Sequence, residues 1–367
     1  MDLELLKFRA ETMQKIRSFF IERKYLELDT PALSSSLIPE TCLEVFKTEY
    51  VEPWTDEKKD MYLVPSPEIY MKRIISQHKV SVFQLSKCYR NVESAGRIHS
   101  PEFTMLEYYT MNASYKESMD ITEDLFRALL PPVPELVATA SDGQYCKTAD
   151  GGESGQTDPW QHLRPPFTRL TMDDAFKKYA GFYLSEAETP AELAEHARRL
   201  GITELPDSPF SKWPWDDLYE LILVQCVEPA LVNEPKPVFL TDYPAKVPCL
   251  AKDVPPVPLS KGGRRAKEPL WKERWELYAS GTELANCYTE EDDPKKVREY
   301  FKTEGRLKDE TAIIPHALDD EYWKVFQDFP HCSGVAMGVD RLIMLLAGRK
   351  SIESVLPFPF RTQPGCY

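Results

Sequence analysis

Hydrophobic positions near the start of the chain recur at three- and four-residue steps, the spacing that places side chains on one face of an α-helix. They include Leu6, Met13, Ile16 and Phe20. This pattern predicts one long amphipathic helix over Leu3–Lys24. The next segment, Tyr25–Thr30, lacks that period and is predicted to be extended until Pro31 ends it.

Shorter apolar patterns predict strands in the region that follows. We expect strands over Leu43–Tyr50, Met61–Val64, Val80–Arg90 and Glu102–Thr110. The last two would form an antiparallel hairpin around the loop Asn91–Pro101, which contains Gly96 and several charged residues.

A helix is predicted between the second and third of these strands, from Ser66 to about His78. Ser66 suits the N-cap and Pro67 suits the first helical position. Glu68 would lie at the positive end of the helix dipole, where a carboxylate is stabilised.

The second half of the chain is helical at first and returns to strands near its end. Two loops rich in Pro, Gly and polar residues, 131–166 and 253–270, enclose a helical region at 171–227. We then expect an extended segment at 271–288, helices at 293–304 and 319–328, a Gly-rich strand at 333–338 and a helix at 340–347. Because strands and helices do not alternate regularly, we predict a single α+β domain over residues 1–367, with an antiparallel β-sheet flanked by helices.

The composition fits a globular protein, since 42% of the 367 residues are hydrophobic and 28% are charged. No apolar run approaches the roughly 18 residues of a membrane span. The segment Met1–Glu4 lacks the basic and apolar regions of a signal peptide. We therefore expect a cytoplasmic protein without membrane contact.

The cysteines and the net charge narrow the function further. None of the eight cysteines forms a C-x-x-C pair, which argues against a zinc site or a disulfide framework. The formal net charge is −14. Proteins that grip nucleic acid through its phosphates usually present a basic surface, so tRNA is not the expected partner.

The first segment with candidate chemistry places Arg90 at the end of a strand, before a loop and the run His99–Phe103. The planar fork of an arginine can clamp a phosphate with two hydrogen bonds. The alternative, more frequent for an isolated arginine, is an ion pair on the surface.

The second segment is Gly281–Asn286, followed by Glu290. Glu283 and Glu290 are seven residues apart and would point to opposite faces of an uninterrupted strand. A turn or bulge, for which Asn286–Cys287 is the expected place, would aim both at one pocket. Two carboxylates there could hold Mg²⁺ together with ATP phosphates, and the alternative is a pair of solvated acids.

The third segment, Gly334–Arg341, spans the change from strand to helix. Its glycines let a ligand approach the backbone closely. Arg341 lies near a positive helix N-terminus, where a phosphate contact is favourable. The alternative is a tight junction in which Asp340 caps the helix and pairs with Arg341.

Three segments together resemble the three signature motifs of class II aminoacyl-tRNA synthetases. They are the first helix with the extended segment up to Pro31, the segment Arg90–Glu107 and Gly338–Arg341. Phe103–Glu107, Glu276–Tyr278 and Gly281–Asn286 are similar to the lysyl branch. The first motif starts near residue 4, which leaves no room for an N-terminal anticodon-binding β-barrel. Over residues 4–130 and 165–357 the chain resembles the elongation factor P β-lysine ligase family.

The resemblance implies an enzyme that uses ATP and Mg²⁺ to adenylate a lysine-like amino acid, (R)-β-lysine. The amino acid would pass to a lysine side chain of elongation factor P, a protein shaped like tRNA, and the enzyme would be a homodimer. Ala336 stands where lysyl-tRNA synthetases have glycine and would reshape the amino-acid pocket.

The resemblance also implies roles for individual residues. Arg90, Arg341 and Glu283 would be catalytic, the two arginines by clamping the ATP phosphates. ATP would be bound by Arg90, Asn91, Glu93, Ser100, Glu283, Leu284, Gly338 and Arg341. The amino acid would be bound by Ser66, Pro67, Glu68, Tyr109, Glu290 and Ala336, and the metal by Glu283 and Glu290.

Two positions depart from the family pattern. Val92 stands where the family has glutamate, which moves that role to Glu93, and Ser100 replaces an asparagine that contacts ATP. Two alternatives stay open, the second of them because of these departures. One is a lysyl-type ligase with a different acceptor, tRNA or a carrier, and the other is a non-catalytic binder of amino acid or nucleotide. The basic residues of the second loop would contact an acidic partner or the ATP entrance, or would simply be solvated: Lys261, Arg264, Arg265 and Lys267.

Overall fold

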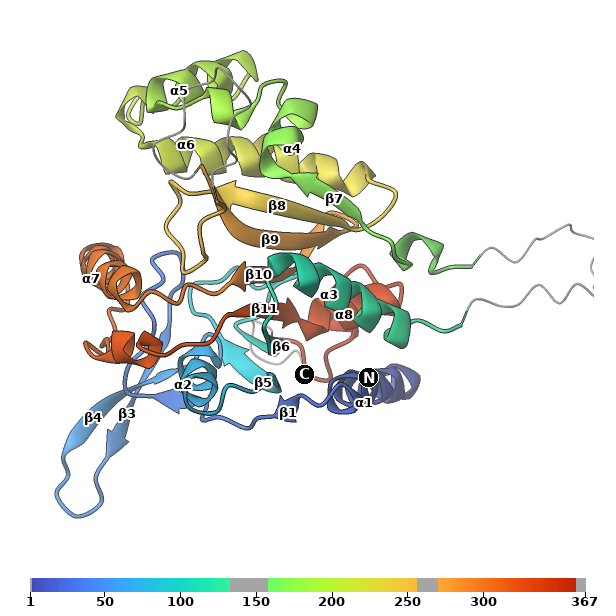
Figure 1. The fold of residues 1–367 in the computed structure, drawn as a ribbon, viewed down its shortest axis with the longest axis vertical. Coiled ribbons are helices and arrows are strands. Elements are labelled where there is room, and N and C mark those ends of the chain that lie inside the picture. Colours follow the sequence, from blue (N-terminus) through green and yellow to red (C-terminus); the bar gives the residue numbers. More distant parts are fainter. Residues whose placement is uncertain (1, 133–157, 256–269, 361–367) are drawn as a thin grey trace, which may run out of the picture.

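An eight-stranded sheet forms the centre of the computed structural model, which describes residues 2–132, 158–255 and 270–360 (Figure 1). In spatial order its strands are β1 (Leu26–Glu27), β5 (Val82–Tyr89), β6 (Glu102–Met111), β11 (Cys332–Gly338), β10 (Thr282–Thr289), β9 (Trp271–Ala279), β8 (Val238–Pro244) and β7 (Thr168–Thr171). Neighbours from β5 to β8 are antiparallel, and only the edge strands β1 and β7 pair in parallel. The predicted α+β fold with an antiparallel sheet is confirmed.

A second, three-stranded sheet has the order β2 (Leu33–Ser34), β4 (Lys58–Leu63) and β3 (Phe46–Val51). Its β3–β4 hairpin projects from the body of the molecule at the lower left of Figure 1. The backbone N–H of Asn91 donates to Glu44 O at 2.8 Å, which joins the base of this hairpin to the loop after β5.

Three groups of helices pack against the main sheet (Figure 1). Helices α1 (Leu3–Glu22), α3 (Tyr115–Leu129) and α8 (Val339–Leu346) share the largest core with it. Helices α4 (Met172–Tyr179), α5 (Pro190–Arg199) and α6 (Trp215–Ile222) form a separate core with β8. Helices α2 (Glu68–His78) and α7 (Pro294–Thr311) contribute to a third.

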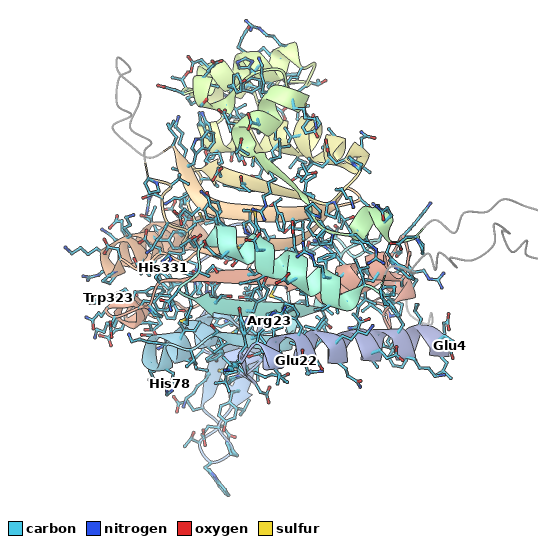
Figure 2. All side chains as sticks on the ribbon, turned by 45° about the vertical axis from the view of Figure 1, so that its right-hand side comes forward. Glu4, Glu22, Arg23, His78, Trp323 and His331 are labelled. Atoms are coloured by element: carbon cyan, nitrogen blue, oxygen red, sulfur yellow. The ribbon has the colours of Figure 1, made fainter. Side chains whose placement is uncertain are left out.

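Helix α1 confirms the prediction from the first hydrophobic pattern. The Asp2 side chain accepts a hydrogen bond from the Glu4 N–H at 3.0 Å and caps the helix. Its buried face includes Ile16 and Phe20, and the Phe20 ring stacks on Phe83 of β5 with centroids 4.9 Å apart. Figure 2 shows Glu4 and Glu22 at the two ends of this helix, which lies along one edge of the molecule.

Several predicted boundaries need correction. The predicted helix 319–328 is only a short 3₁₀ turn, Tyr322–Phe326, because the Asp319 side chain accepts the Glu321 N–H at 2.9 Å and forms a local turn. The N-cap of α2 is Pro67 rather than Ser66, although Ser66 Oγ still accepts the Glu68 N–H at 3.3 Å.

The two predicted loops lie largely outside the described residues, which exclude 133–157 and 256–269 and therefore all four basic residues of the second loop. Within the described end of the first loop, Gln161–Leu163 forms a 3₁₀ turn, and Leu163 is fully buried in the main core. That part of the segment packs against the sheet instead of forming the predicted loop.

Membrane-spanning helices and the state of the cysteines can be described only for the residues that the structure covers. In residues 2–132, 158–255 and 270–360, no helix has the length and apolar character needed to cross a membrane. The six cysteines in the same ranges are free thiols.

Candidate active site

Four neighbouring strands, β6, β11, β10 and β9, form the floor of the candidate active site. Along each of them, successive side chains point to opposite faces of the sheet. One set of side chains faces the main core: Leu106, Tyr108, Val335, Met337, Cys287, Trp275 and Leu277. The residues between them line a cavity of about 680 Å³ on the opposite face: Glu107, Tyr109, Gly334, Ala336, Asn286, Tyr288, Arg274 and Glu276. Cavities of this size hold small-molecule substrates.

Backbone pairing arranges these cavity residues in two rows across the strands. The first row runs Glu107, Ala336, Asn286, Glu276, and the second runs Tyr109, Gly334, Tyr288, Arg274. Adjacent strands are about 4.8 Å apart, so roughly 14 Å separates the strand positions at the two ends of a row. A floor of that width can carry two substrates side by side.

A β-bulge brings Glu283 onto the same floor. The register between β9 and β10 shifts between Glu283 and Ala285, so one residue is inserted and the side-chain parity changes. Both Glu283 and Glu290 consequently line the cavity. The predicted bulge is present, and it lies earlier than the expected Asn286–Cys287.

Arg341 occupies one end of the cavity and is held by backbone carbonyls. Its Nε donates to Ile98 O at 3.0 Å and its Nη1 donates to Glu283 O at 2.7 Å. The neighbouring Asp340 neither caps α8 nor pairs with Arg341, because its carboxylate accepts from Arg9 Nη1 at 2.7 Å and from the Thr104 N–H at 2.7 Å. The alternative predicted for this junction, in which Asp340 caps the helix and pairs with Arg341, is therefore not observed.

Arg90 adds a second positive charge at the same end. Its guanidinium lies 5.3 Å from the centroid of the Phe103 ring, and its Nε has no hydrogen-bond partner within the described ranges. His99 Nε2 lies 3.4 Å from Glu93 Oε1. Burial and the two nearby arginines nevertheless lower the pKa of His99. This end of the cavity suits an anion with several charges, such as a polyphosphate.

Three carboxylates, those of Glu68, Glu107 and Glu290, gather at another part of the cavity. Glu107 Oε1 accepts from Tyr109 Oη at 2.7 Å, while its Oε2 has no hydrogen-bond partner among the described residues. Burial and the Glu68 carboxylate raise the pKa of Glu107 to about 8. Burial also raises the pKa of Glu290 to about 7, against the opposing effect of Lys72. A bound ammonium group would favour the ionised form of both carboxyl groups and so lower their pKa values.

The carboxylate that faces Glu283 is Glu276. Desolvation and the Glu276 charge raise the pKa of Glu283 to about 7, although 43% of the Glu283 side chain is still exposed in the open cavity. Glu276 is oriented at both oxygens, by Arg274 at 2.6 Å and by Tyr278 Oη at 2.7 Å.

This pair fits a magnesium ion that keeps water and phosphate oxygens among its ligands. Within the described residues no group of three or more His, Cys, Asp or Glu side chains is arranged for a metal, so most of the ligands of such an ion would have to be water and phosphate oxygens. Glu290, predicted as the second ligand, lies with its Oε2 only 2.7 Å from Lys72 Nζ. Glu276 is itself paired with Arg274 at 2.6 Å, but it is the carboxylate whose charge acts on Glu283, which favours it as the neighbouring ligand.

All but two of the predicted site residues line the cavity, the exceptions being Asn91 and Pro67. Asn91 stabilises the loop instead, since its Nδ2 donates to Val45 O at 3.3 Å and its Oδ1 accepts the Val92 N–H at 2.9 Å.

Sequence reasoning assigned no role to several residues that the structure places in or beneath the cavity: Lys72, Glu107, Arg274, Glu276, Asn286 and Tyr288. The strand residues among them follow a period of two, which could have identified them. Lys72 has no such signal, because helical lysines are usually solvated.

Comparison with known proteins agrees with this geometry. The profile of the family described as "tRNA synthetases class II (D, K and N)" matches residues 3–362. A protein named elongation factor P–(R)-β-lysine ligase from Vibrio vulnificus is 32% identical over 359 residues, covering 98% of this chain and 96% of its own length. Its namesake from Vibrio cholerae is 32% identical over 97% of this chain and 95% of its own.

A third relative with the same name, from Proteus mirabilis, is 31% identical over 356 residues, which cover 97% of this chain and 94% of its own. The similarity thus extends over nearly the whole length of both partners and includes all the cavity-lining strands. The chain belongs to the class II tRNA synthetase family, in its branch of elongation factor P–(R)-β-lysine ligases, and is an ATP-dependent amino-acid ligase.

Proposed function

We propose that this enzyme adenylates a lysine-like amino acid, (R)-β-lysine, and transfers it to a lysine side chain of elongation factor P. The observation that carries the proposal is the division of charge in one cavity. Arg90 and Arg341 both lie close enough to His99 and Glu283 to shift their pKa values, whereas Glu68 and Glu290 lie beside Glu107. The names of the relatives supply the isomer and the acceptor.

The acidic part of the cavity would bind the two ammonium groups of the amino acid. Glu107 Oε2 is a buried acceptor without a partner among the described residues, so it is available to one of them. Ala336 and Gly334 form the floor beside it. The lack of a side chain at Gly334 makes room for Glu290 and Tyr109, and the single methyl of Ala336 leaves the space that the carbon chain of the substrate would fill.

In the first step, a carboxylate oxygen of the amino acid attacks the α-phosphorus of ATP and pyrophosphate leaves. Arg90 and Arg341 would stabilise the charge that develops on the phosphate oxygens. The carbonyl groups that hold Arg341 fix it before the reaction, so no reorientation is needed. Mg²⁺, held by Glu276 and Glu283, would supply further neutralisation of phosphate charge.

In the second step, the neutral amine of the acceptor lysine attacks the carbonyl carbon of the adenylate. An amide bond forms, AMP leaves with the electron pair of the broken bond, and the amine loses a proton. Acidic side chains also line the cavity: Glu40, Asp216, Asp217, Glu220 and Glu304. They would favour the approach of a lysine side chain over that of a nucleic-acid backbone.

The proposal is tested by incubating elongation factor P with the enzyme, ATP and each lysine isomer, followed by intact-mass measurement. The expected result is one added β-lysyl group with the (R)-β isomer, and none on an acceptor whose target lysine is replaced by arginine. Labelling of tRNA in place of elongation factor P would contradict the proposed acceptor.

A further inference from the structure

Lys72 is a lysine buried completely beneath the amino-acid end of the cavity. It lies on α2, one helical turn after Glu68, and its side chain is 0% exposed. An isolated buried ammonium is very unfavourable and persists only when anionic groups surround it. Its presence here therefore calls for a specific set of partners.

Those partners are carboxylates of the site itself. Lys72 Nζ donates to Glu68 Oε1 and lies 2.7 Å from Glu290 Oε2, as an ion pair and not as a well-aligned hydrogen bond. The Phe326 ring centroid is 6.0 Å away. The other titratable groups that sense its charge come from four further segments: Tyr322, Glu107, Glu40 and Cys332.

A count of charges shows what the pocket lacks. Glu68, Glu107 and Glu290 carry three negative charges when ionised, and Lys72 supplies one positive charge. Two further positive charges would balance these three carboxylates, which is the number of ammonium groups on a diamino acid. Glu40, which also senses Lys72, has Arg90 and Arg274 as further positive neighbours and is not counted. An amino acid with a single ammonium group would leave one carboxylate buried without compensation.

We propose that Lys72 is a positioning residue of the amino-acid site, which neutralises and orients the carboxylates of Glu68 and Glu290 so that the pocket selects a diamino acid. The inference rests on the proposed function. Lys72 contacts carboxylates that bind the substrate, and it acts through them.

The loss of this charge has a distinctive effect on pH dependence. The ammonium of Lys72 opposes the rise in the pKa of Glu290 and of Glu107. Without it, both carboxyls would stay protonated to higher pH and would bind an ammonium poorly near neutrality. Affinity for the amino acid should then recover as the pH rises and the carboxyls ionise.

The test uses Lys72→Gln, which keeps most of the length and a donor but removes the charge. Lys72→Arg keeps the charge, and Lys79→Gln serves as a matched control because Lys79 ends the same helix and pairs with exposed Asp328. Pyrophosphate exchange is measured at several pH values with the amino acid and ATP varied separately. We expect the KM for (R)-β-lysine to rise at least about tenfold in Lys72→Gln at neutral pH, with the KM for ATP nearly unchanged.

The outcomes separate the two proposals. An alkaline shift of the KM profile for the amino acid in Lys72→Gln, absent in Lys72→Arg and Lys79→Gln, supports the role of Lys72. Equal losses for both substrates without a pH shift would overturn it while the function stands. If Lys72→Gln does not fold, the test rests on Lys72→Arg, which keeps the charge. An alkaline shift of its KM profile for the amino acid would overturn the role of Lys72. Absence of exchange and of amino-acid binding in the wild-type enzyme would overturn both proposals.

Discussion

Gly334 lies where the cavity floor has no room for a side chain. A Cβ atom at this position would be 2.3 Å from Glu290 Oε1 and 2.5 Å from Tyr109 Cε1. Gly334→Ala must displace both side chains, so we expect the KM for the amino acid to rise at least about tenfold with little change for ATP. Steady-state pyrophosphate exchange measures both constants.

The control for this variant is Gly96→Ala, because a Cβ at Gly96 meets no atom within 4 Å. That control should keep both constants close to those of the wild-type enzyme. An unchanged KM for the amino acid in Gly334→Ala would mean that Glu290 and Tyr109 do not form the amino-acid site.

The buried carboxyl of Glu107 predicts how stability depends on pH. Its pKa in the folded protein is raised to about 8, whereas a glutamate in an unfolded chain titrates near about 4.3. Between these values the folded chain holds a proton that the unfolded chain has lost, so stability falls as the pH rises from about 4.3 to about 8. Urea unfolding across this pH range should show that the free energy of unfolding falls less steeply with pH in Glu107→Gln than in the wild-type protein. The same slope in both proteins would contradict the raised pKa.

At the scale of residues, the sequence could predict the groups that stand out by type and spacing. Arg90, Glu283 and Arg341 were found in this way, and all three line the cavity. Lys72 could not be found, because its burial depends on contacts between α2 and the strand end at Glu290, which lie far apart in the chain.

At the scale of elements, the β5–β6 hairpin was predictable from two apolar patterns on either side of a charged loop. The need for a bulge in β10 followed from side-chain parity, although its position did not. The helix predicted at 319–328 was wrong because local side-chain hydrogen bonds compete with helix formation. Neither the pairing of β11 between β6 and β10 nor the joining of β9 to β8 could be read from local patterns, since these contacts are set by the packing of the whole sheet.

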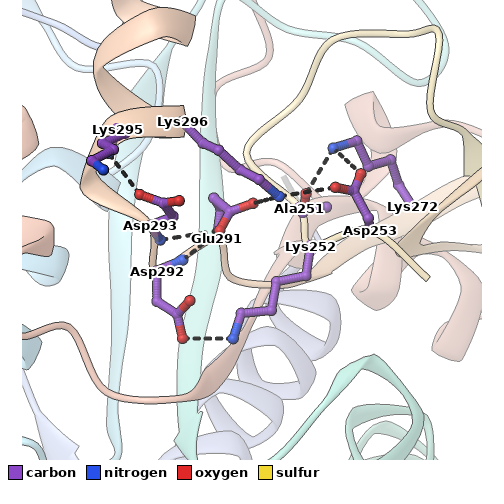
Figure 3. A network of polar contacts seen from close by, with 9 residues as sticks. All are labelled: Ala251, Lys252, Asp253, Lys272, Glu291, Asp292, Asp293, Lys295 and Lys296. Carbon is purple, nitrogen blue, oxygen red and sulfur yellow. Dashed lines mark hydrogen bonds and ion pairs between the residues drawn. The ribbon is translucent and has the colours of Figure 1, made fainter. Parts of the chain in front are cut away.

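A network of ion pairs beside the cavity joins the segment around Asp253 to strand β9 and helix α7 (Figure 3). Asp253 lies between Lys272 of β9, at 2.7 Å, and Lys296 of α7, at 2.9 Å, and Lys296 also contacts Glu291 at 3.0 Å. These pairs hold in place the segment before Asp253, which contains the cavity-lining residue Leu250. Burial opposes the effect of the two lysines, but they still lower the pKa of Asp253.

Asp253→Asn is therefore expected to lower the free energy of unfolding by about 1 kcal/mol, a value kept small because half of the Lys296 side chain is exposed. Urea unfolding at low and high salt measures the change, which should shrink with added salt. Asp60→Asn, which breaks the exposed Lys47 pair on the β3–β4 hairpin, should have no measurable effect. Equal effects of the two substitutions would contradict the network.

At the scale of the whole molecule, one sheet separates an apolar core from a charged cavity, and the helices around it close the sides (Figures 1 and 2). The absence of a tRNA partner, a cytoplasmic location and the single-domain organisation stay predictions from the sequence. The same holds for dimer formation through α1.

The predicted homodimer has a direct measurement. Helix α1 and the segment after it expose apolar side chains that a second subunit could cover: Leu3, Ile21, Leu26 and Leu33. Light scattering on the purified protein should give twice the mass of one chain. An active species with the mass of a single chain would contradict the predicted dimer.

The central claim is that the divided cavity activates a diamino acid with ATP. Its most direct test is ATP–pyrophosphate exchange with (R)-β-lysine, (S)-β-lysine and α-lysine side by side, with Arg341→Ala as the control. The account predicts exchange that is strongest with (R)-β-lysine and that falls by at least about a hundredfold in Arg341→Ala. Absence of exchange with all three amino acids, or full exchange in Arg341→Ala, would contradict it.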